Sequence, residues 1–162
     1  MIDELLEEVQ EDENSPIVLA SGVCKIFEGL YLRPYLCPGG VPTIGYGTTR
    51  YEDGVRVTLT DAPITKNRAE ELLMHELRTV CFPSVMRLCP TLEKWGVGAI
   101  AAIIDFTYNL GAGNLQSSTL RRRILENNKN AAKHELKRWV IGGGRVLPGL
   151  VKRRDAEVAL IG

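Results

Sequence analysis

The sequence predicts an α+β fold that is mainly α-helical and contains one small antiparallel sheet. Apolar residues recur at helical spacing before residue 29 and again after residue 65. Residues 31–59 are instead rich in glycine and in short runs of Tyr, Val, Thr and Ile, which is typical of hairpins. The 162 residues are 44% hydrophobic and 25% charged, a composition that suits one globular domain.

The first 16 residues are predicted to be an acidic extension of this domain. Residues 1–13 favour a short helix, but Asn14-Ser15-Pro16 interrupts it, because proline disfavours helical geometry at the residue before it. A single domain is therefore expected over residues 17–162.

The first helix of the domain is predicted over residues 17–28. Its apolar side chains recur at helical spacing at Leu19, Val23, Ile26 and Phe27. Gly29 stands where a C-terminal cap would fall, so the helix is expected to end at Glu28.

The sheet is predicted within residues 31–59, where five glycine or proline signals mark the turns. These signals are Gly39-Gly40, Pro42, Gly45, Gly47 and Asp53-Gly54.

The remainder of the chain is predicted to be helical. Thr65 is a candidate N-cap for the next helix, and Pro83 and Pro90 are expected to divide the region that follows. Residues 95–108 are apolar on nearly all sides, which indicates a central buried helix and the hydrophobic core. Further helices are expected over residues 118–127, 130–139 and 150–160, with Gly142-Gly143-Gly144 as a break.

The charge of the chain is unevenly distributed although its net value is zero. Residues 1–14 hold seven acidic residues and no base, which leaves the remainder at +7. Residues 121–154 contain eleven Lys or Arg and two Glu. This segment predicts either a solvated helix surface or a basic face for an anionic polymer, such as nucleic acid or cell wall.

Cysteines, histidines and hydropathy set further expectations. The four cysteines allow three full pairings, and neither their spacing nor the two distant histidines resembles a zinc site, so no metal and no cofactor is expected. No run approaches the roughly 20 apolar residues of a bilayer span, and the acidic start is unlike a secretory signal. We therefore expect a chain without a membrane anchor that begins in the cytoplasm.

Glu28 is the candidate catalytic acid. Hydrolysis of a glycosidic bond requires a carboxylic acid that is protonated near neutral pH, so that it can protonate the leaving oxygen. A helix C-terminus and the apolar neighbours Ile26, Phe27 and Leu30 would both favour the protonated form of Glu28. Without its neighbouring motif, Glu28 is better interpreted as an exposed residue at a frayed helix end.

The surrounding motif resembles the phage lysozymes of glycoside hydrolase family 24. Their signature is Glu, eight residues, Asp or Cys, five residues, Thr, which Glu28, Cys37 and Thr43 match. The resemblance spans about residues 18–160 and includes these segments: residues 28–37, 42–47, 104–111, 118–120 and 143–157, with Trp139.

This resemblance implies a lysozyme-like fold, in which a long helix joins a small β subdomain to a helical lobe and the active cleft lies between them. It implies a muramidase that cleaves the β-1,4 bond between N-acetylmuramic acid and N-acetylglucosamine, usually with inversion. Glu28 then corresponds to the general acid, Thr43 to a residue that helps to hold the water, and Cys37 to the second catalytic group.

Two positions depart from the commonest family pattern. Most relatives have Asp where this chain has Cys37, so the thiol is interpreted as a thiolate base, a group that positions water, or an inert side chain. Many relatives have His where this chain has Thr48. Certain membrane-tethered relatives form a caging disulfide, and Cys24 would be the favoured partner for Cys37 if one formed here.

Sugar recognition requires flat apolar faces beside amide and hydroxyl groups. The substrate-binding candidates are Tyr46, Phe106, Asn109 and Ser118. For Phe106, a place in the core is the favoured alternative. Asp105 is expected to form a buried ion pair with a C-terminal Arg, such as Arg145 or Arg154.

We therefore expect a monomeric endolysin that acts on peptidoglycan and waits in the host cytoplasm for a separate holin-like protein. The alternatives are a lytic transglycosylase, which also relies on one Glu, and a weakly active wall-binding protein. A nucleic-acid binder is the least favoured class, because it leaves the Glu28 and Thr43 pattern unexplained.

Overall fold

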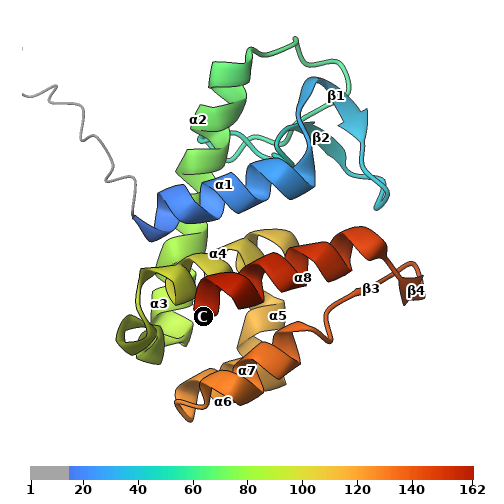
Figure 1. The fold of residues 1–162 in the computed structure, drawn as a ribbon. Coiled ribbons are helices and arrows are strands. Elements are labelled where there is room, and N and C mark those ends of the chain that lie inside the picture. Colours follow the sequence, from blue (N-terminus) through green and yellow to red (C-terminus); the bar gives the residue numbers. More distant parts are fainter. Residues whose placement is uncertain (1–14) are drawn as a thin grey trace, which may run out of the picture.

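The computed structural model describes residues 15–162, so the predicted acidic helix over residues 1–13 lies outside the described part. Figure 1 shows a small upper part that contains the β1–β2 hairpin and a larger helical part below it. The helices are α1 (Pro16–Glu28), α2 (Lys66–Glu76), η2 (Leu77–Cys81), α3 (Phe82–Leu88), η3 (Pro90–Trp95), α4 (Val97–Leu110), α5 (Ala112–Ser117), α6 (Thr119–Leu125), α7 (Lys129–Leu136) and α8 (Pro148–Ile161). The strands are β1 (Tyr31–Leu36), β2 (Pro42–Gly45), β3 (Ile141–Gly142) and β4 (Arg145–Val146).

The predicted antiparallel sheet is confirmed as the β1–β2 hairpin. Tyr31 lies opposite Gly45 and Tyr35 opposite Thr43, with an irregularity in the register between these two pairs. The expected break at Gly142-Gly143-Gly144 is a second small hairpin, in which β3 pairs with β4 around two glycines of positive φ.

One long helical run joins the upper part to the lower part. Elements α2, η2 and α3 follow one another without interruption from Lys66 to Leu88, and the Thr65 hydroxyl caps the start by accepting from the Arg68 amide. The sequence prediction that Pro83 divides this region is wrong. Pro83 lies in the first turn of α3, directly after a π-helical turn in which the Phe82 amide donates to the Leu77 carbonyl. The wider π turn accommodates the proline ring within a continuing helix.

The predicted central helix is confirmed as α4, whose residues 99–107 are all buried. Helices α1 and α8 make their most extensive contacts with α4, and the three run side by side in Figure 1. The three later helices are also found, with boundaries shifted by up to three residues, whereas α5 was not predicted. Among the described residues, none of the helices is both long enough and apolar enough to cross a bilayer.

Candidate active site

Glu28 is the last residue of α1, as the sequence predicts, and Gly29 with φ 71° turns the chain towards β1. Its Oε1 accepts a hydrogen bond of 2.6 Å from Arg153 Nη1, and its side chain is 22% exposed. The expected apolar cover is largely absent, because Ile26 is 75% and Leu30 is 37% exposed. These two side chains face solvent at the end of α1, so the immediate neighbour of Glu28 is a cation.

The turn after β2 packs directly against Glu28. Gly47 has φ 89°, and a Cβ at this position would lie 3.2 Å from Glu28 Oε2 and 3.3 Å from the Tyr108 hydroxyl. The Tyr108 hydroxyl donates to the Tyr46 carbonyl, which fixes the same turn to α4. Glycine is therefore required here both for its backbone angle and for its size.

Arg153 holds Glu28 to a buried ion cluster contributed by α1, α4 and α8. Its Nε and Nη2 donate to Asp105 Oδ2 and Oδ1 at 2.9 and 2.8 Å, and the Cys24 thiol donates to Oδ1 at 3.1 Å. The predicted buried ion pair of Asp105 with a C-terminal Arg is confirmed, but the partner is Arg153 and not the suggested Arg145 or Arg154. Arg145 is exposed, and Arg154 instead donates to Asn109. Because consecutive helix positions differ by about 100° in direction, only Arg153 of α8 points at both carboxylates.

Asp105 remains ionised in this cluster. Burial is the largest single effect and opposes its charged form, but the hydrogen bonds from Arg153, Glu157 and Cys24 and the charge of Arg153 together lower the pKa of Asp105 below its ordinary value. Glu157 lies on the other side, where burial and the neighbouring Asp105 raise the pKa of its carboxyl. Arg153 is thus fixed by one permanent anion while it also binds Glu28.

Cys37 and Thr43 lie together at the turn of the β1–β2 hairpin. Backbone hydrogen bonds from Val41 and Gly39, with a further contribution from the Thr43 hydroxyl, lower the pKa of the Cys37 thiol. Thr43 is 3% exposed, and its hydroxyl donates to the Val41 carbonyl at 2.9 Å. The two residues that the sequence grouped as catalytic partners are therefore neighbours.

All four cysteines are free, so the structure does not contain the suggested Cys24–Cys37 disulfide. Cys24, Cys81 and Cys89 are buried, whereas Cys37 is partly exposed. Cys24 faces Asp105 inside the helical part, away from the hairpin turn. Within residues 15–162, no group of His, Cys, Asp or Glu side chains could hold a metal ion.

A cavity of about 430 Å³ opens beside Glu28. Glu28, Asn109 and Arg153 supply its polar lining, and Phe27 with residues 147–150 completes the wall. Asn109 Oδ1 accepts from Arg154 at 2.8 Å, which orients the amide at the cavity. Asn109 is thus close to the candidate acid, as expected of a substrate-binding residue.

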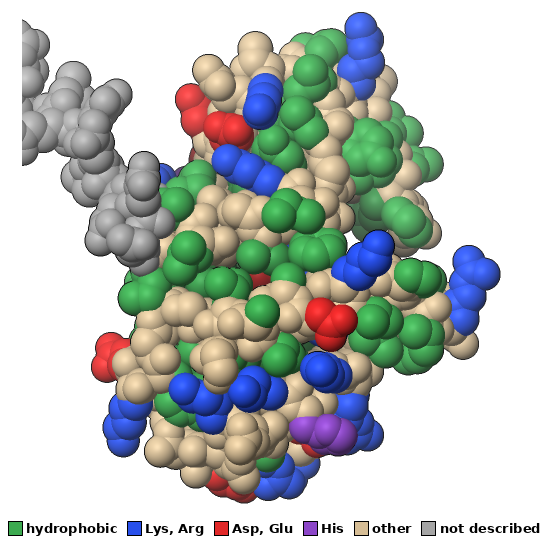
Figure 2. Space-filling view, viewed as in Figure 1, with side chains coloured by type: hydrophobic (Ala, Val, Ile, Leu, Met, Phe, Trp, Pro, Cys, Tyr) green, Lys and Arg blue, Asp and Glu red, His purple; other side chains and the backbone are tan. Residues whose placement is uncertain are grey.

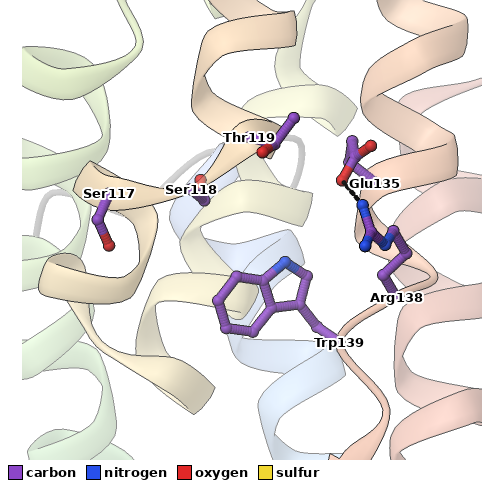
Figure 3. Close-up of a pocket in the computed structure, with 6 residues that line it drawn as sticks. All are labelled: Ser117, Ser118, Thr119, Glu135, Arg138 and Trp139. Atoms are coloured by element: carbon purple, nitrogen blue, oxygen red, sulfur yellow. Dashed lines mark hydrogen bonds and ion pairs between the residues drawn. The ribbon is translucent and has the colours of Figure 1, made fainter.

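A second cavity, of about 410 Å³, is shown in Figure 3 and contains Ser118. Its lining residues are Ser117, Ser118, Thr119, Glu135, Arg138 and Trp139. The Trp139 ring lies below the serine and threonine side chains, and Arg138 pairs with Glu135 at 3.2 Å. The Ser118 hydroxyl already caps α6 by accepting from Arg121, and it donates to the Leu115 carbonyl.

Two substrate-binding assignments require correction. Phe106 is fully buried and packs edge-on against Trp139, so the core alternative holds. Tyr46 is only 5% exposed, because the turn after β2 directs its ring into the core. Neither ring offers a face to a ligand.

Besides Phe27 in the cavity wall, two partly or largely exposed aromatic rings, Tyr31 and Tyr35, follow Glu28 on β1, and the sequence did not single them out. Their ring centroids are 4.0 Å apart with an interplanar angle of 27°. Their spacing along a predicted strand was the available signal, since residues four apart share one face. Thr48, which replaces the commoner His, is buried, and its hydroxyl has no partner among the described residues.

Comparison with known proteins places these features in a family. The family model described as phage lysozyme matches residues 25–157. A SAR-endolysin of Bacteriophage PS34 is 34% identical over 133 residues, which cover 80% of this chain and 73% of the relative. An endolysin of Acyrthosiphon pisum secondary endosymbiont phage 1 is 31% identical over 140 residues, which cover 84% of this chain and 90% of the relative.

Solved structures show the same architecture. The endolysin from Escherichia coli O157:H7 phage FAHEc1 is 28% identical with a TM-score of 0.68, covering 88% of this chain and 90% of that one. The active form of the P1 phage endolysin Lyz has a TM-score of 0.74 at 19% identity, covering 99% and 93% of the two chains. At that identity the second likeness concerns the fold alone.

Proposed function

The chain belongs to the phage lysozyme family, and we propose that Glu28 is the general acid with which it cleaves peptidoglycan. The chain is an endolysin with muramidase activity, a glycoside hydrolase of bacterial cell walls. The assignment of Glu28 rests on one observation: its carboxyl group accepts a hydrogen bond from Arg153 at Oε1 and lines an open cavity. We propose that residues 17–162 form the single catalytic domain.

In the proposed reaction, Glu28 protonates the glycosidic oxygen as the bond to the sugar carbon breaks. Arg153 then stabilises the carboxylate that this proton transfer leaves behind. A water molecule held near Thr43 attacks the sugar carbon from the opposite face, and the Cys37 thiolate accepts a proton from that water. The outcome is hydrolysis with inversion, which leaves a reducing end.

The test of Glu28 compares wild type with Glu28→Gln on permeabilised Gram-negative cells. Clearing of turbidity should fall by at least about 100-fold, because a neutral amide cannot supply the proton, while circular dichroism should remain unchanged. Equal clearing by the two proteins would reject the assignment. Mass spectrometry of the digest identifies the chemistry, since a 1,6-anhydro product would signify a lytic transglycosylase.

The role of Cys37 needs a separate pair of variants. The lowered pKa of its thiol increases the fraction of thiolate at any given pH, which favours a role as base. Cys37→Asp should retain activity, whereas Cys37→Ser should lose at least about 100-fold because a hydroxyl is a much weaker base. Full activity in Cys37→Ser would show that position 37 needs only to hold water.

We also propose Asn109 and Ser118 as substrate contacts, since each lines one of the two cavities described above. We further propose that the protein is a monomer in the host cytoplasm and reaches the cell wall after a holin-like protein opens the membrane. Cells that express the chain alone should then stay intact until the membrane is permeabilised from outside.

A further inference from the structure

The stacked rings of Tyr31 and Tyr35 form an aromatic surface on β1 that no catalytic role uses. Tyr31 is 46% exposed, and Tyr35 is only partly buried. Neither ring belongs to the hydrophobic core, and neither hydroxyl makes a hydrogen bond within residues 15–162. Tyr51 is a useful contrast, because its hydroxyl donates to Asp61 and so helps to hold its loop.

The two rings extend from the candidate acid to the candidate base. Tyr31 Cε2 lies 3.6 Å from the position of a Cβ on Gly29, the residue that follows Glu28. Tyr35 lies directly opposite Thr43 in the hairpin, two residues before Cys37. Burial, then Tyr31, and then the nearby charges of Glu28 and Cys37 raise the pKa of Tyr35, which agrees with a place between them.

Other apolar side chains of β1 are exposed as well. Leu32 and Leu36 of the same strand are 42% and 54% exposed. Figure 2 shows hydrophobic side chains gathered on the right of the upper part, where the hairpin lies. An exposed apolar surface next to a hydrolytic site is typical of ligand contact.

We propose that the stacked pair of Tyr31 and Tyr35 forms a stacking platform next to the scissile bond, in which the outer face of one ring contacts the apolar face of one hexopyranose ring of the glycan strand and the other ring supports it from behind. This inference rests on the proposed function and identifies where the glycan strand is bound. A pyranose ring presents C–H groups on its face and hydroxyls at its edge. A flat aromatic surface buries the former and leaves the latter free for polar partners such as Asn109.

The test measures binding apart from chemistry. In the Glu28→Gln background, calorimetry with soluble, uncross-linked strands of alternating N-acetylglucosamine and N-acetylmuramic acid gives the dissociation constant. Tyr31→Leu and Tyr35→Leu should each weaken binding by roughly tenfold. Tyr31→Phe and Tyr35→Phe should bind as the parent does, because the platform depends on ring faces and not on hydroxyls.

The control is Val55→Ala, which removes another exposed apolar side chain of the upper part and should leave binding unchanged. In the active protein, the leucine variants should raise KM about tenfold with kcat within about twofold. If the leucine variants bind the strands with the same dissociation constant as the parent, the platform is rejected. Loss in the phenylalanine variants as large as in the leucine variants overturns it too, because the hydroxyls would then be responsible.

Failure of this inference and failure of the proposed function give different results. If the wild type releases reducing ends and the leucine variants do so with unchanged KM, the platform is rejected and the muramidase mechanism stands. If the wild type releases none while binding still depends on the ring faces, the mechanism is rejected and the platform stands.

Discussion

Arg153 donates to two carboxylates at once and is only 3% exposed. Its bond to Glu28 gives the candidate acid a fixed orientation, and its bidentate bond to Asp105 fixes the guanidinium itself. The position of one oxygen of the candidate acid therefore depends on a carboxylate at the centre of the helical part. Asp105 is in this sense a positioning residue for Glu28.

The Asp105→Asn variant tests this dependence. Breaking a buried ion pair on one side should lower the free energy of unfolding by about 3 kcal/mol at neutral pH. Because folding lowers the pKa of Asp105 from 3.8, its stabilisation is present above that pH and is lost as pH falls through the folded pKa. Urea unfolding of both proteins should thus show a difference that is constant above about pH 5 and shrinks below it.

The matched control for this measurement is Asp155→Asn on α8, the helix that carries Arg153. Asp155 is exposed and pairs with Lys137 only at 4.0 Å, so its loss should cost less than about 0.5 kcal/mol. A difference between wild type and Asp105→Asn that persists undiminished to pH 2 would contradict the ionised state assigned to Asp105.

At the level of elements, α4 and α8 approach each other so closely that only glycine fits at the start of α4. A Cβ on Gly98 would overlap the Leu160 carbonyl oxygen of α8. Gly98→Ala should therefore separate the helices and lower the free energy of unfolding by about 2 kcal/mol, measured by urea denaturation.

Gly22→Ala on α1 is the control for this substitution, because no atom lies within 4 Å of its Cβ position. That change should leave stability unaltered or raise it by up to about 1 kcal/mol, since alanine favours helix more than glycine does. Similar destabilisation by both variants would argue against a steric origin at Gly98.

The elements also show what the sequence could predict. The end of α1 at Glu28 and the hairpin with Cys37 and Thr43 depend on local signals, namely a glycine and turn residues, and both were predicted. The choice between Arg153 and Arg154 was not predictable, because it depends on how α8 is rotated about its axis when it packs on α4.

Tyr46 illustrates the same limit. Local pattern indicates a hairpin residue but does not tell which side of the hairpin a helix covers. A Cβ on Gly45 would lie 3.2 Å from the Ala69 side chain, so α2 covers this end of β2. The adjacent Tyr46 ring is accordingly buried, and the solvent-facing aromatic surface lies on β1 instead.

At the scale of the whole molecule, the distribution of charge influences how the enzyme associates with the cell wall. Residues 15–162 carry a net +7, and Figure 2 shows Lys and Arg side chains across the lower, helical part. Several of these bases already pair with acids, among them Arg123 with Glu126 and Arg138 with Glu135. The net charge of the whole chain is zero, so it is the local excess of Lys and Arg on this part that should attract an anionic wall, over a distance set by the salt concentration.

Raising the salt concentration from 0.1 to 1 M shortens the screening length from about 10 to about 3 Å. Clearing of anionic cell walls should fall several-fold over this range, as turbidity at matched enzyme concentration would show. Binding of an uncharged oligomer of N-acetylglucosamine, measured by calorimetry, should change little. If clearing of cell walls and binding of the uncharged oligomer depended equally on salt, long-range electrostatic attraction would not govern association of the enzyme with the wall.

Because Cys37 is partly exposed, its reaction with an alkylating reagent can be used to follow folding and binding. The other three thiols are at most 3% exposed, and only the thiol at the hairpin turn has its pKa lowered. A folded molecule should consume one equivalent of iodoacetamide and an unfolded molecule four, as intact-mass measurement would count. Bound substrate should slow that single reaction, so the rate of alkylation reads occupancy of the cleft without any engineered label.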